Sequence, residues 1–135
     1  MTETIFSKII RKEIPAEIVY EDEKTLAFLD INPVNRGHTL LITKTPYKNL
    51  YEIADNDLGD LMKVVKKVAI SIKAGLGADG INIEMNNETA AGQIVMHAHI
   101  HIIPRFEGDG LKHWPGKIYK EGEAKEIGEK IRNSF

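Results

Sequence analysis

The sequence predicts an α+β fold in which about five strands form an antiparallel sheet, with two or three helices packed beside it. Short β-like segments recur along the chain at residues 18–31, 38–43, 81–86 and 95–103. One long segment instead places apolar residues at three- and four-residue steps, the pattern of an amphipathic helix. The short connections between the β-like segments leave little room for the crossovers that a parallel sheet needs.

The first half of the chain combines one helix with three strands. Four elements are predicted there: a helix over residues 3–14 that Pro15 ends, a hairpin over residues 18–31, a loop over residues 32–37 and a strand over residues 38–43. The hairpin turns at the charged stretch Glu21–Lys24, and the loop sequence NPVNRG is typical of a turn.

The long helix is predicted from Leu58 to Gly75, with lysines opposite its apolar stripe. Asp55 and Asp57 are candidate N-caps, and Gly75 and Gly77 mark its end. Two strands and a short helix are predicted to follow: residues 81–86, residues 95–103 and residues 123–132.

The composition is that of an ordinary globular protein, and it narrows the range of partners. The chain has 135 residues, of which 42% are hydrophobic and 28% charged, and a formal net charge of −2. That balance lacks the basic excess needed to bind a nucleic-acid backbone. No cysteine is present, which excludes disulfides and thiol catalysis. The N-terminus lacks the apolar core of a signal peptide and no segment is long enough to span a membrane, so we expect a cytoplasmic location without membrane partners.

Three of the five histidines stand at alternate positions in the segment HAHIHII, residues 97–103. On a strand, alternate side chains share a face, so His97, His99 and His101 would line one side while the apolar residues between them enter the core. Three interpretations compete: a metal site, a polar strand face without function, and catalysis by a nucleophilic imidazole. A flat strand makes it hard for three imidazoles to meet one metal, whereas a neutral imidazole is a nucleophile near neutral pH.

Three ordered segments carry a resemblance to a known family: residues 4–33, the segment GHTLLITK at residues 37–44, and residues 86–105 around the histidines. HAHIHII matches the pattern His-φ-His-φ-His-φ-φ, in which φ is a hydrophobic residue. The chain resembles the histidine triad (HIT) superfamily, and it is most similar to the Hint branch of nucleotide-binding phosphoramidases.

The resemblance implies a single HIT domain over residues 1–135, with a core at about residues 4–105 and a C-terminal extension at about residues 106–135. It also implies a five-stranded antiparallel sheet with two main helices. Two subunits would form a homodimer in which their sheets join into one, and the long helix would supply much of the interface.

The chemistry implied by the resemblance is cleavage at the α-phosphate of a nucleotide derivative, without a cofactor or metal. His99 would attack phosphorus and form a nucleotidyl-histidine, which water then hydrolyses. His101 would hydrogen-bond the phosphate, while His97 and His38 would support the imidazole network. We therefore expect a purine nucleoside phosphoramidase that acts on small AMP-like substrates.

The resemblance implies a nucleotide-binding set as well. Asp30 would accept hydrogen bonds from the two ribose hydroxyls, and Asn86 would contact the ribose or the phosphate. The slot for the base would be apolar and consist of Ile5, Phe6, Ile9, Phe28 and Ile31. The turn that faces the phosphate through its backbone N–H groups would consist of Gly92, Gln93 and Ile94. Relatives commonly carry Ser or Thr at position 94, so Ile94 lacks a hydroxyl that can assist the leaving group.

Three other functions remain open from the sequence. The same nucleophile can hydrolyse dinucleoside polyphosphates, which differ only in the leaving group. A nucleotide-binding protein without catalysis would need the pocket but not His99. A metal-binding protein would contain stoichiometric zinc and lose its activity to chelators.

Overall fold

The computed structural model describes residues 3–135, and its centre is a five-stranded sheet in the order β1–β2–β3–β5–β4. The strands are β1 (Ile18–Glu21), β2 (Thr25–Leu29), β3 (Thr39–Thr43), β4 (Gly80–Met85) and β5 (His99–Arg105). Every neighbouring pair is antiparallel. The predicted α+β class with an antiparallel sheet is therefore confirmed.

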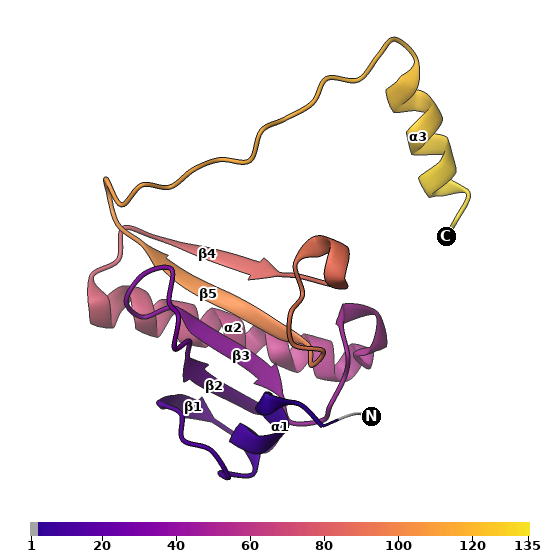
Figure 1. Cartoon of the computed structure of the whole chain (residues 1–135). Coiled ribbons are helices and arrows are strands. Elements are labelled where there is room, and N and C mark those ends of the chain that lie inside the picture. The colour runs from indigo at the N-terminus through magenta and orange to yellow at the C-terminus, as the bar shows by residue number, and fades with distance from the viewer. Residues whose placement is uncertain (1–2) are drawn as a thin grey trace.

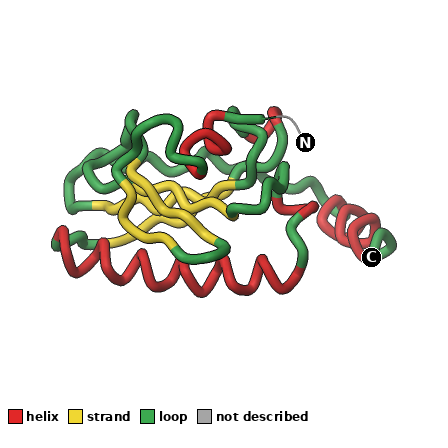
Figure 2. Tube along the Cα trace, turned by 90° about the horizontal axis from the view of Figure 1, so that it is seen from below, coloured by secondary structure: helices red, strands yellow, loops and turns green. Residues whose placement is uncertain are grey.

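Helices cover the sheet unequally on its two faces. The helical elements are α1 (Ile5–Ile10), α2 (Asp55–Leu76), α3 (Glu123–Arg132) and two single 3-10 turns, η1 (Leu50–Glu52) and η2 (Thr89–Ala91). The long helix α2 runs across one face, and the short helix α1 lies on the other (Figures 1 and 2). Much of the α1 face is left to loops, which gives room for a site there.

The alternation of side chains divides the core into two halves. On the α2 side, Leu41, Ile100 and Ile102 pack with the buried face of α2. On the α1 side, Leu40 and Ile42 pack with a second cluster that includes Phe6 of α1. The odd-numbered positions of β5 therefore point to the α1 side, where His99 and His101 lie.

Two predicted helix boundaries were wrong. The first helix ends at Ile10 and does not continue to residue 14, because Lys12 adopts a left-handed conformation with φ of 63° and turns the chain back. The long helix begins at Asp55, with Ala54 at the N-cap position and no side-chain cap. Asp55 and Asp57 lie in its first turn, where negative charge favours the helix dipole.

The strand that carries the histidines also differs from the prediction of residues 95–103. It begins at His99, because the preceding Ala98 N–H donates to the Tyr47 carbonyl and does not join a strand ladder. It continues through Pro104 to Arg105, beyond the predicted end at residue 103. Strand β3 pairs with β5 only as far as Ile102, so the missing N–H of Pro104 falls beyond the β3 ladder.

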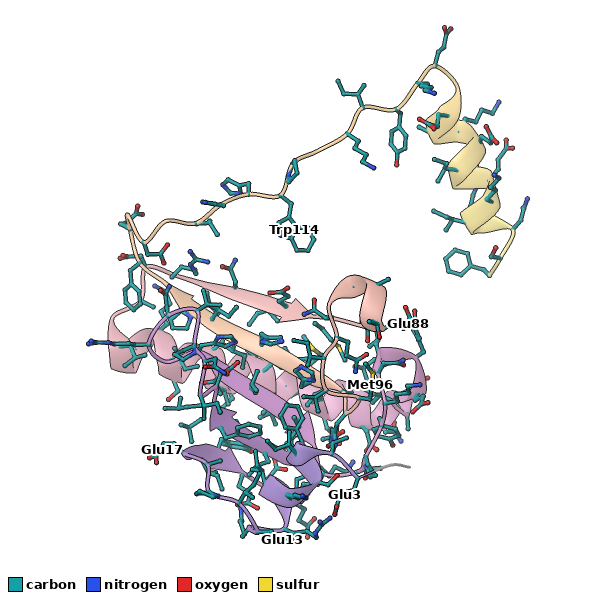
Figure 3. The ribbon with its side chains drawn as sticks, in the orientation of Figure 1. Glu3, Glu13, Glu17, Glu88, Met96 and Trp114 are labelled. Carbon is teal, nitrogen blue, oxygen red and sulfur yellow. The ribbon has the colours of Figure 1, made fainter. Side chains whose placement is uncertain are left out.

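The C-terminal segment leaves the body of the protein. Residues 106–122 contain no helix or strand, and they run from the end of β5 to α3, which stands apart from the sheet (Figure 1). Trp114 projects from this segment and is 86% exposed (Figure 3). None of the helices within residues 3–135 is both long and apolar enough to cross a bilayer.

Candidate active site

A pocket of about 610 Å³ opens on the α1 face of the sheet. Its wall is mostly apolar and includes Ile5, Phe6, Ile9, Phe28, Ile31 and Leu40. Its polar residues include Asp30, Asn86, His99 and His101. The structure therefore brings together residues from α1, from the segments that follow β2 and β4, and from β5.

Helix α1 positions the aromatic part of this wall. Its N-terminus is closed by a capping box in which Thr4 and Ser7 bond to each other's backbone N–H groups. Phe6 points from this helix toward β5, and its ring centroid lies 5.1 Å from that of His99 in an edge-to-face arrangement. The buried phenyl ring therefore shields one side of the His99 imidazole from water.

The hydrogen bonds of His99 determine which ring nitrogen is free. Its Nδ1 lies 2.7 Å from the carbonyl oxygen of His97. A carbonyl can only accept, so the Nδ1 of a neutral His99 carries the proton and Nε2 carries the lone pair. Among the described residues, Nε2 has no hydrogen-bond partner and is not sealed from solvent. His99 thus presents an unprotonated nitrogen at the pocket.

A chain of hydrogen bonds fixes the tautomer of His101 in the opposite sense. The backbone N–H of Val34 donates to His38 Nδ1 over 3.0 Å, so the proton of a neutral His38 sits on Nε2. His38 Nε2 lies 2.9 Å from His101 Nδ1 and donates to it. His101 must then carry its own proton on Nε2. His99 offers a lone pair, and His101 offers an N–H donor.

His97 has a different environment from the other two residues of the motif. It precedes β5, is completely buried and does not line the pocket. Its Nε2 donates to the Thr43 carbonyl over 2.7 Å, while its Nδ1 is buried without a partner among the described residues. His97 therefore ties the segment before β5 to the end of β3, and this tie places the carbonyl that orients His99.

Burial favours the neutral form of all four imidazoles. Burial is the largest influence on each, and it lowers the pKa of His38, His97, His99 and His101 below the ordinary imidazole range. Asp30 Oδ2 lies 3.7 Å from His38 Nε2 and favours protonation of that ring. Burial outweighs this attraction in lowering the pKa of His38, so the contact is not an ion pair.

Asp30 follows β2 and has one carboxylate oxygen in use. Its Oδ1 accepts the Asn32 N–H over 2.8 Å and holds the start of the following loop. Its Oδ2 faces the imidazole pair. Asp30, His38 and His101 each offer one metal-ligating atom within 4.8 Å of the others. This set differs from the three histidines of the motif, and a metal there would have to displace the proton between His38 and His101.

The turn at Gly92–Ile94 is placed differently from the expectation. Gly92 and Ile94 line the pocket, but the N–H groups of Gly92 and Gln93 already donate to Thr89 and Glu88. The Gln93 side chain is buried outside the pocket, where it donates to two carbonyls and accepts the Glu88 N–H. Gln93 therefore holds the turn together, and its backbone N–H is not available for a phosphate.

The sequence interpretation missed groups that act through the backbone. The Val34 N–H and the His97 and Thr43 carbonyls orient the imidazoles, and no side-chain pattern could indicate them. It also missed part of the apolar wall. The sequence pattern predicted a helix up to residue 14, whereas the helix ends at Ile10 and the segment after it lines the pocket. These wall residues are Ile14, Pro15 and Ala16.

Several known proteins are similar to this chain in sequence. The HIT domain family profile matches residues 11–108. An uncharacterised HIT-like protein of Methanocaldococcus jannaschii is 52% identical over 91% of this chain and 90% of its own length. Adenosine 5′-monophosphoramidase hnt1 of Schizosaccharomyces pombe is 39% identical over 97% of both chains. Adenylylsulfatase HINT3 of Arabidopsis thaliana is 42% identical over 79% of this chain and 54% of its own length.

Solved structures agree over almost the whole chain. The crystal structure of a HIT family member from Bacillus subtilis has a TM-score of 0.90 and 40% identity, covering 99% of this chain and 98% of that one. A crystal structure from Streptococcus mutans has a TM-score of 0.92 and 37% identity, covering 99% of this chain and 86% of that one. The chain belongs to the HIT, or histidine triad, family.

Proposed function

We propose that this protein hydrolyses AMP derivatives at the α-phosphate through a covalent nucleotidyl-His99, as a purine nucleoside phosphoramidase. One observation carries the proposal above the others. The unprotonated Nε2 of His99 and the N–H donor of His101 stand side by side, with ring centroids 5.1 Å apart, in a pocket whose wall is mostly apolar. A nucleophile and a donor for a phosphate oxygen are the two groups that attack on phosphorus needs.

The first step forms one bond and breaks one. The lone pair of His99 Nε2 attacks the α-phosphorus, and the bond from phosphorus to the leaving nitrogen breaks as that nitrogen takes up a proton from solvent. The imidazole then carries a positive charge, because Nδ1 keeps its proton. The His97 carbonyl at 2.7 Å from Nδ1 stabilises that charge. His101 donates to a phosphate oxygen throughout.

The second step returns the enzyme to its starting state. A water oxygen attacks phosphorus, the bond between phosphorus and Nε2 breaks, and AMP leaves with the hydroxyl while the proton passes to solvent. The His99 side chain is again a neutral imidazole, with the same tautomer that it had before. Because the His97 carbonyl fixes this tautomer, no ring flip separates two turnovers.

The apolar wall and Asp30 fit the nucleoside part of such a substrate. In this proposal an adenine ring enters between the side chains of Ile9, Phe28 and Ile31, which all line the pocket. Asp30 Oδ2, at the polar end, can accept from the vicinal ribose hydroxyls. The two enzyme names among the relatives, adenosine monophosphoramidase and adenylylsulfatase, share the adenylyl group and differ in the leaving group. The adenylyl half is therefore the common element in this proposal.

A single-turnover reaction tests this function. Wild type and His99→Asn are mixed with adenosine 5′-phosphoramidate, quenched at early times and analysed by intact mass. We expect a transient gain of one AMP on wild type alone. The same reaction with a diadenosine polyphosphate decides between the two leaving groups. If wild type binds AMP but neither gains mass nor releases product with both substrates, the enzyme proposal is wrong and the pocket only senses nucleotides.

The proposal includes a homodimer that joins two sheets through β4. This strand is at the edge of the sheet, and its Ile83 is 46% exposed although Ile81 and Met85 on the same face pack into the core. An apolar edge strand is suited to pair with another copy. Light scattering should show a dimer for wild type and a loss of mass for Ile83→Lys. The cytoplasmic location stays a prediction.

A further inference from the structure

The C-terminal arm, residues 106–135, has an apolar surface that its own body does not cover. Six large apolar side chains of the arm are exposed: Leu111, Trp114, Ile118, Tyr119, Ile131 and Phe135. Among the described residues, no hydrogen bond or ion pair joins residues 110–135 to the rest of the chain. A patch of this kind marks an interaction surface.

Helix α3 concentrates part of this surface on one face. Within α3, Ala124, Ile127 and Ile131 follow one another at three- and four-residue steps, so they form a single stripe, and the exposed Phe135 comes just after the helix. The opposite face carries charged residues such as Glu129. A helix of this length is marginal in water by itself and needs packing along its apolar stripe. Something must therefore cover α3 in the folded protein.

The position of the arm is shared with solved relatives. Residues 106–135 make up more than a fifth of the chain, and every residue has equal weight in a TM-score. The value of 0.90 over 99% of this chain could not be reached if the arm of the Bacillus subtilis protein lay elsewhere. The Bacillus subtilis chain therefore carries its arm in a similar position relative to its own body.

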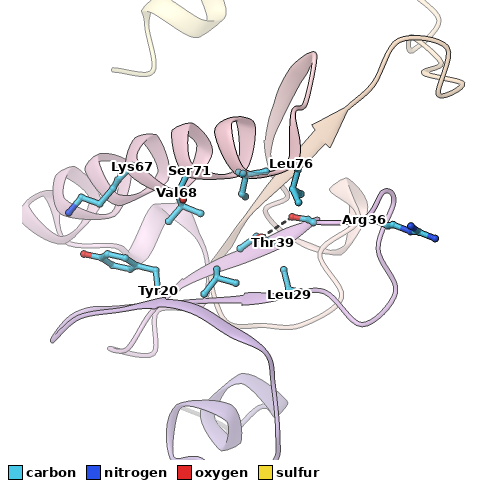
Figure 4. Close-up of a pocket in the computed structure, with 12 residues that line it drawn as sticks. Tyr20, Leu29, Arg36, Thr39, Lys67, Val68, Ser71 and Leu76 are labelled. Atoms are coloured by element: carbon cyan, nitrogen blue, oxygen red, sulfur yellow. Dashed lines mark hydrogen bonds between the residues drawn. The ribbon is translucent and has the colours of Figure 1, made fainter.

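A groove on the opposite side of the sheet from the candidate active site has matching properties. It has a volume of about 550 Å³ and lies between α2 and strands β1 to β3 (Figure 4). Its lining is mainly apolar and includes Val19, Tyr20, Leu29, Val68, Ile72 and Leu76. Arg36 and Lys67 give the groove a positive charge, and the first turn of α3 carries Glu123 and Glu126.

We propose that α3 of one copy of this chain occupies this groove on a second copy, so that two subunits exchange their arms. The strap of residues 106–122 can span roughly 55–60 Å when extended, and it leads across the β4 edge away from its own groove (Figure 1). Exchange of a terminal segment is a common way for identical chains to associate. The apolar stripe of α3 and the apolar groove are then covered by each other.

The absence of cysteine allows a direct test by site-specific cross-linking. Ser71→Cys places a thiol in the groove, at an exposed position of α2, and Ile131→Cys places one on the stripe of α3. The two full-length variants are purified separately, mixed, equilibrated and treated with a short bis-maleimide. We expect a covalent dimer that contains one chain of each kind. Glu129→Cys, on the polar face of α3, replaces Ile131→Cys in the control and should give none.

Two outcomes would overturn the proposal. In the double variant Ser71→Cys/Ile131→Cys, a cross-link inside one chain would show that α3 folds back onto its own groove. No cross-link above the Glu129→Cys control in either format would show that α3 does not use the groove. Turnover of adenosine phosphoramidate is measured on the same samples, so a failure of the proposed function is seen separately from a failure of arm exchange.

Discussion

Two hollows of similar size lie on opposite faces of the sheet, and the polar groups that line them differ. The pocket under α1 measures about 610 Å³ and the groove beside α2 about 550 Å³, and both have mostly apolar walls. The pocket contains two neutral imidazoles and a carboxylate at one end, whereas the only charged groups of the groove are Arg36 and Lys67. The two hollows are therefore alike in volume and in apolar character. They differ in the kind and orientation of a few polar groups.

The largest effect expected from this comparison is a loss of turnover that follows substitution in the pocket but not in the groove. His99→Asn removes the nucleophile and should lower kcat by at least about 10⁴-fold, with little change in stability. Val68→Ala removes two methyl groups from a buried residue of the groove and should lower the free energy of unfolding by about 1–3 kcal/mol, with kcat retained. Steady-state kinetics and urea unfolding of both variants measure the two effects.

A tautomer test distinguishes the active-site histidines from a polar strand face. His38→Ala removes the donor to His101 Nδ1, so the His101 proton can move to Nδ1 and leave Nε2 without a donor for the phosphate. Loss of one hydrogen bond to a charged group should lower kcat by roughly 10- to 100-fold. ¹⁵N NMR of the imidazoles should show the change of tautomer. His113→Ala, at an exposed histidine of the arm, should change neither quantity.

Asp30 tests whether the polar end of the pocket recognises ribose. Asp30→Asn keeps the shape and the hydrogen bond to Asn32 but removes the charge that accepts from ribose hydroxyls. We expect KM to rise about tenfold or more, the range for a charge-assisted hydrogen bond. A 2′-deoxy substrate should show a smaller effect of the same substitution. An equal effect on both substrates would mean that Asp30 acts on the imidazoles and not on the sugar.

The sequence predicted the sheet, the long helix and the alternation that separates His99 and His101 from Ile100 and Ile102. These features follow from side-chain periodicity, which is local. It did not predict that His97 precedes the strand, because the Thr43 carbonyl that holds this residue comes from a distant part of the chain. Contacts of this kind depend on the tertiary structure and leave no pattern in the residues that make them.

The same limit explains the difference at Gln93. As part of a glycine-containing turn, this residue was expected to offer its backbone N–H to a phosphate. In the structure that N–H donates to Glu88, and the side chain donates to the carbonyls of Lys48 and Val95. A turn has as many internal acceptors as donors, and which donors stay free is decided by how the turn closes. Residue types alone cannot give that result.

The pH dependence of turnover should separate the imidazoles from the carboxylates. Burial lowers the pKa of His99 below the ordinary value of 6.5, so kcat/KM should stay level as the pH falls to 6.5. It should then decrease about tenfold per pH unit below the lowered pKa of His99, because a protonated ring cannot attack. A decline that begins above pH 6.5 would contradict the neutral, buried nucleophile.

Stability should follow the same histidines over an adjacent range of pH. Below pH 6.5 the unfolded chain binds protons that the buried imidazoles exclude, so the free energy of unfolding decreases as the pH falls toward the folded-state pKa values. Asp22 acts at lower pH. Burial raises its pKa, but its hydrogen bonds together outweigh burial and lower the pKa to about 2, so its stabilisation is lost only as the pH falls below the ordinary carboxylate range. Urea unfolding at a series of pH values should therefore show two separate declines.

The smallest expected effect concerns the residue at position 94 and the help that it can give to the leaving group of the substrate. Ile94 lines the pocket but is 90% exposed, so substitution there should not disturb packing. Ile94→Thr and Ile94→Val have the same shape and differ only in a hydroxyl, which can donate to the leaving nitrogen. One neutral hydrogen bond corresponds to a gain of about two- to tenfold in kcat for the Thr variant over the Val variant.

The ratio of the two kcat values should be largest for a phosphoramidate of a strongly basic amine, because such an amine is the poorest leaving group without a donor. Equal rates for the two variants at every amine would show that the leaving group departs away from residue 94, and that the apolar side chain there costs this protein no catalytic assistance.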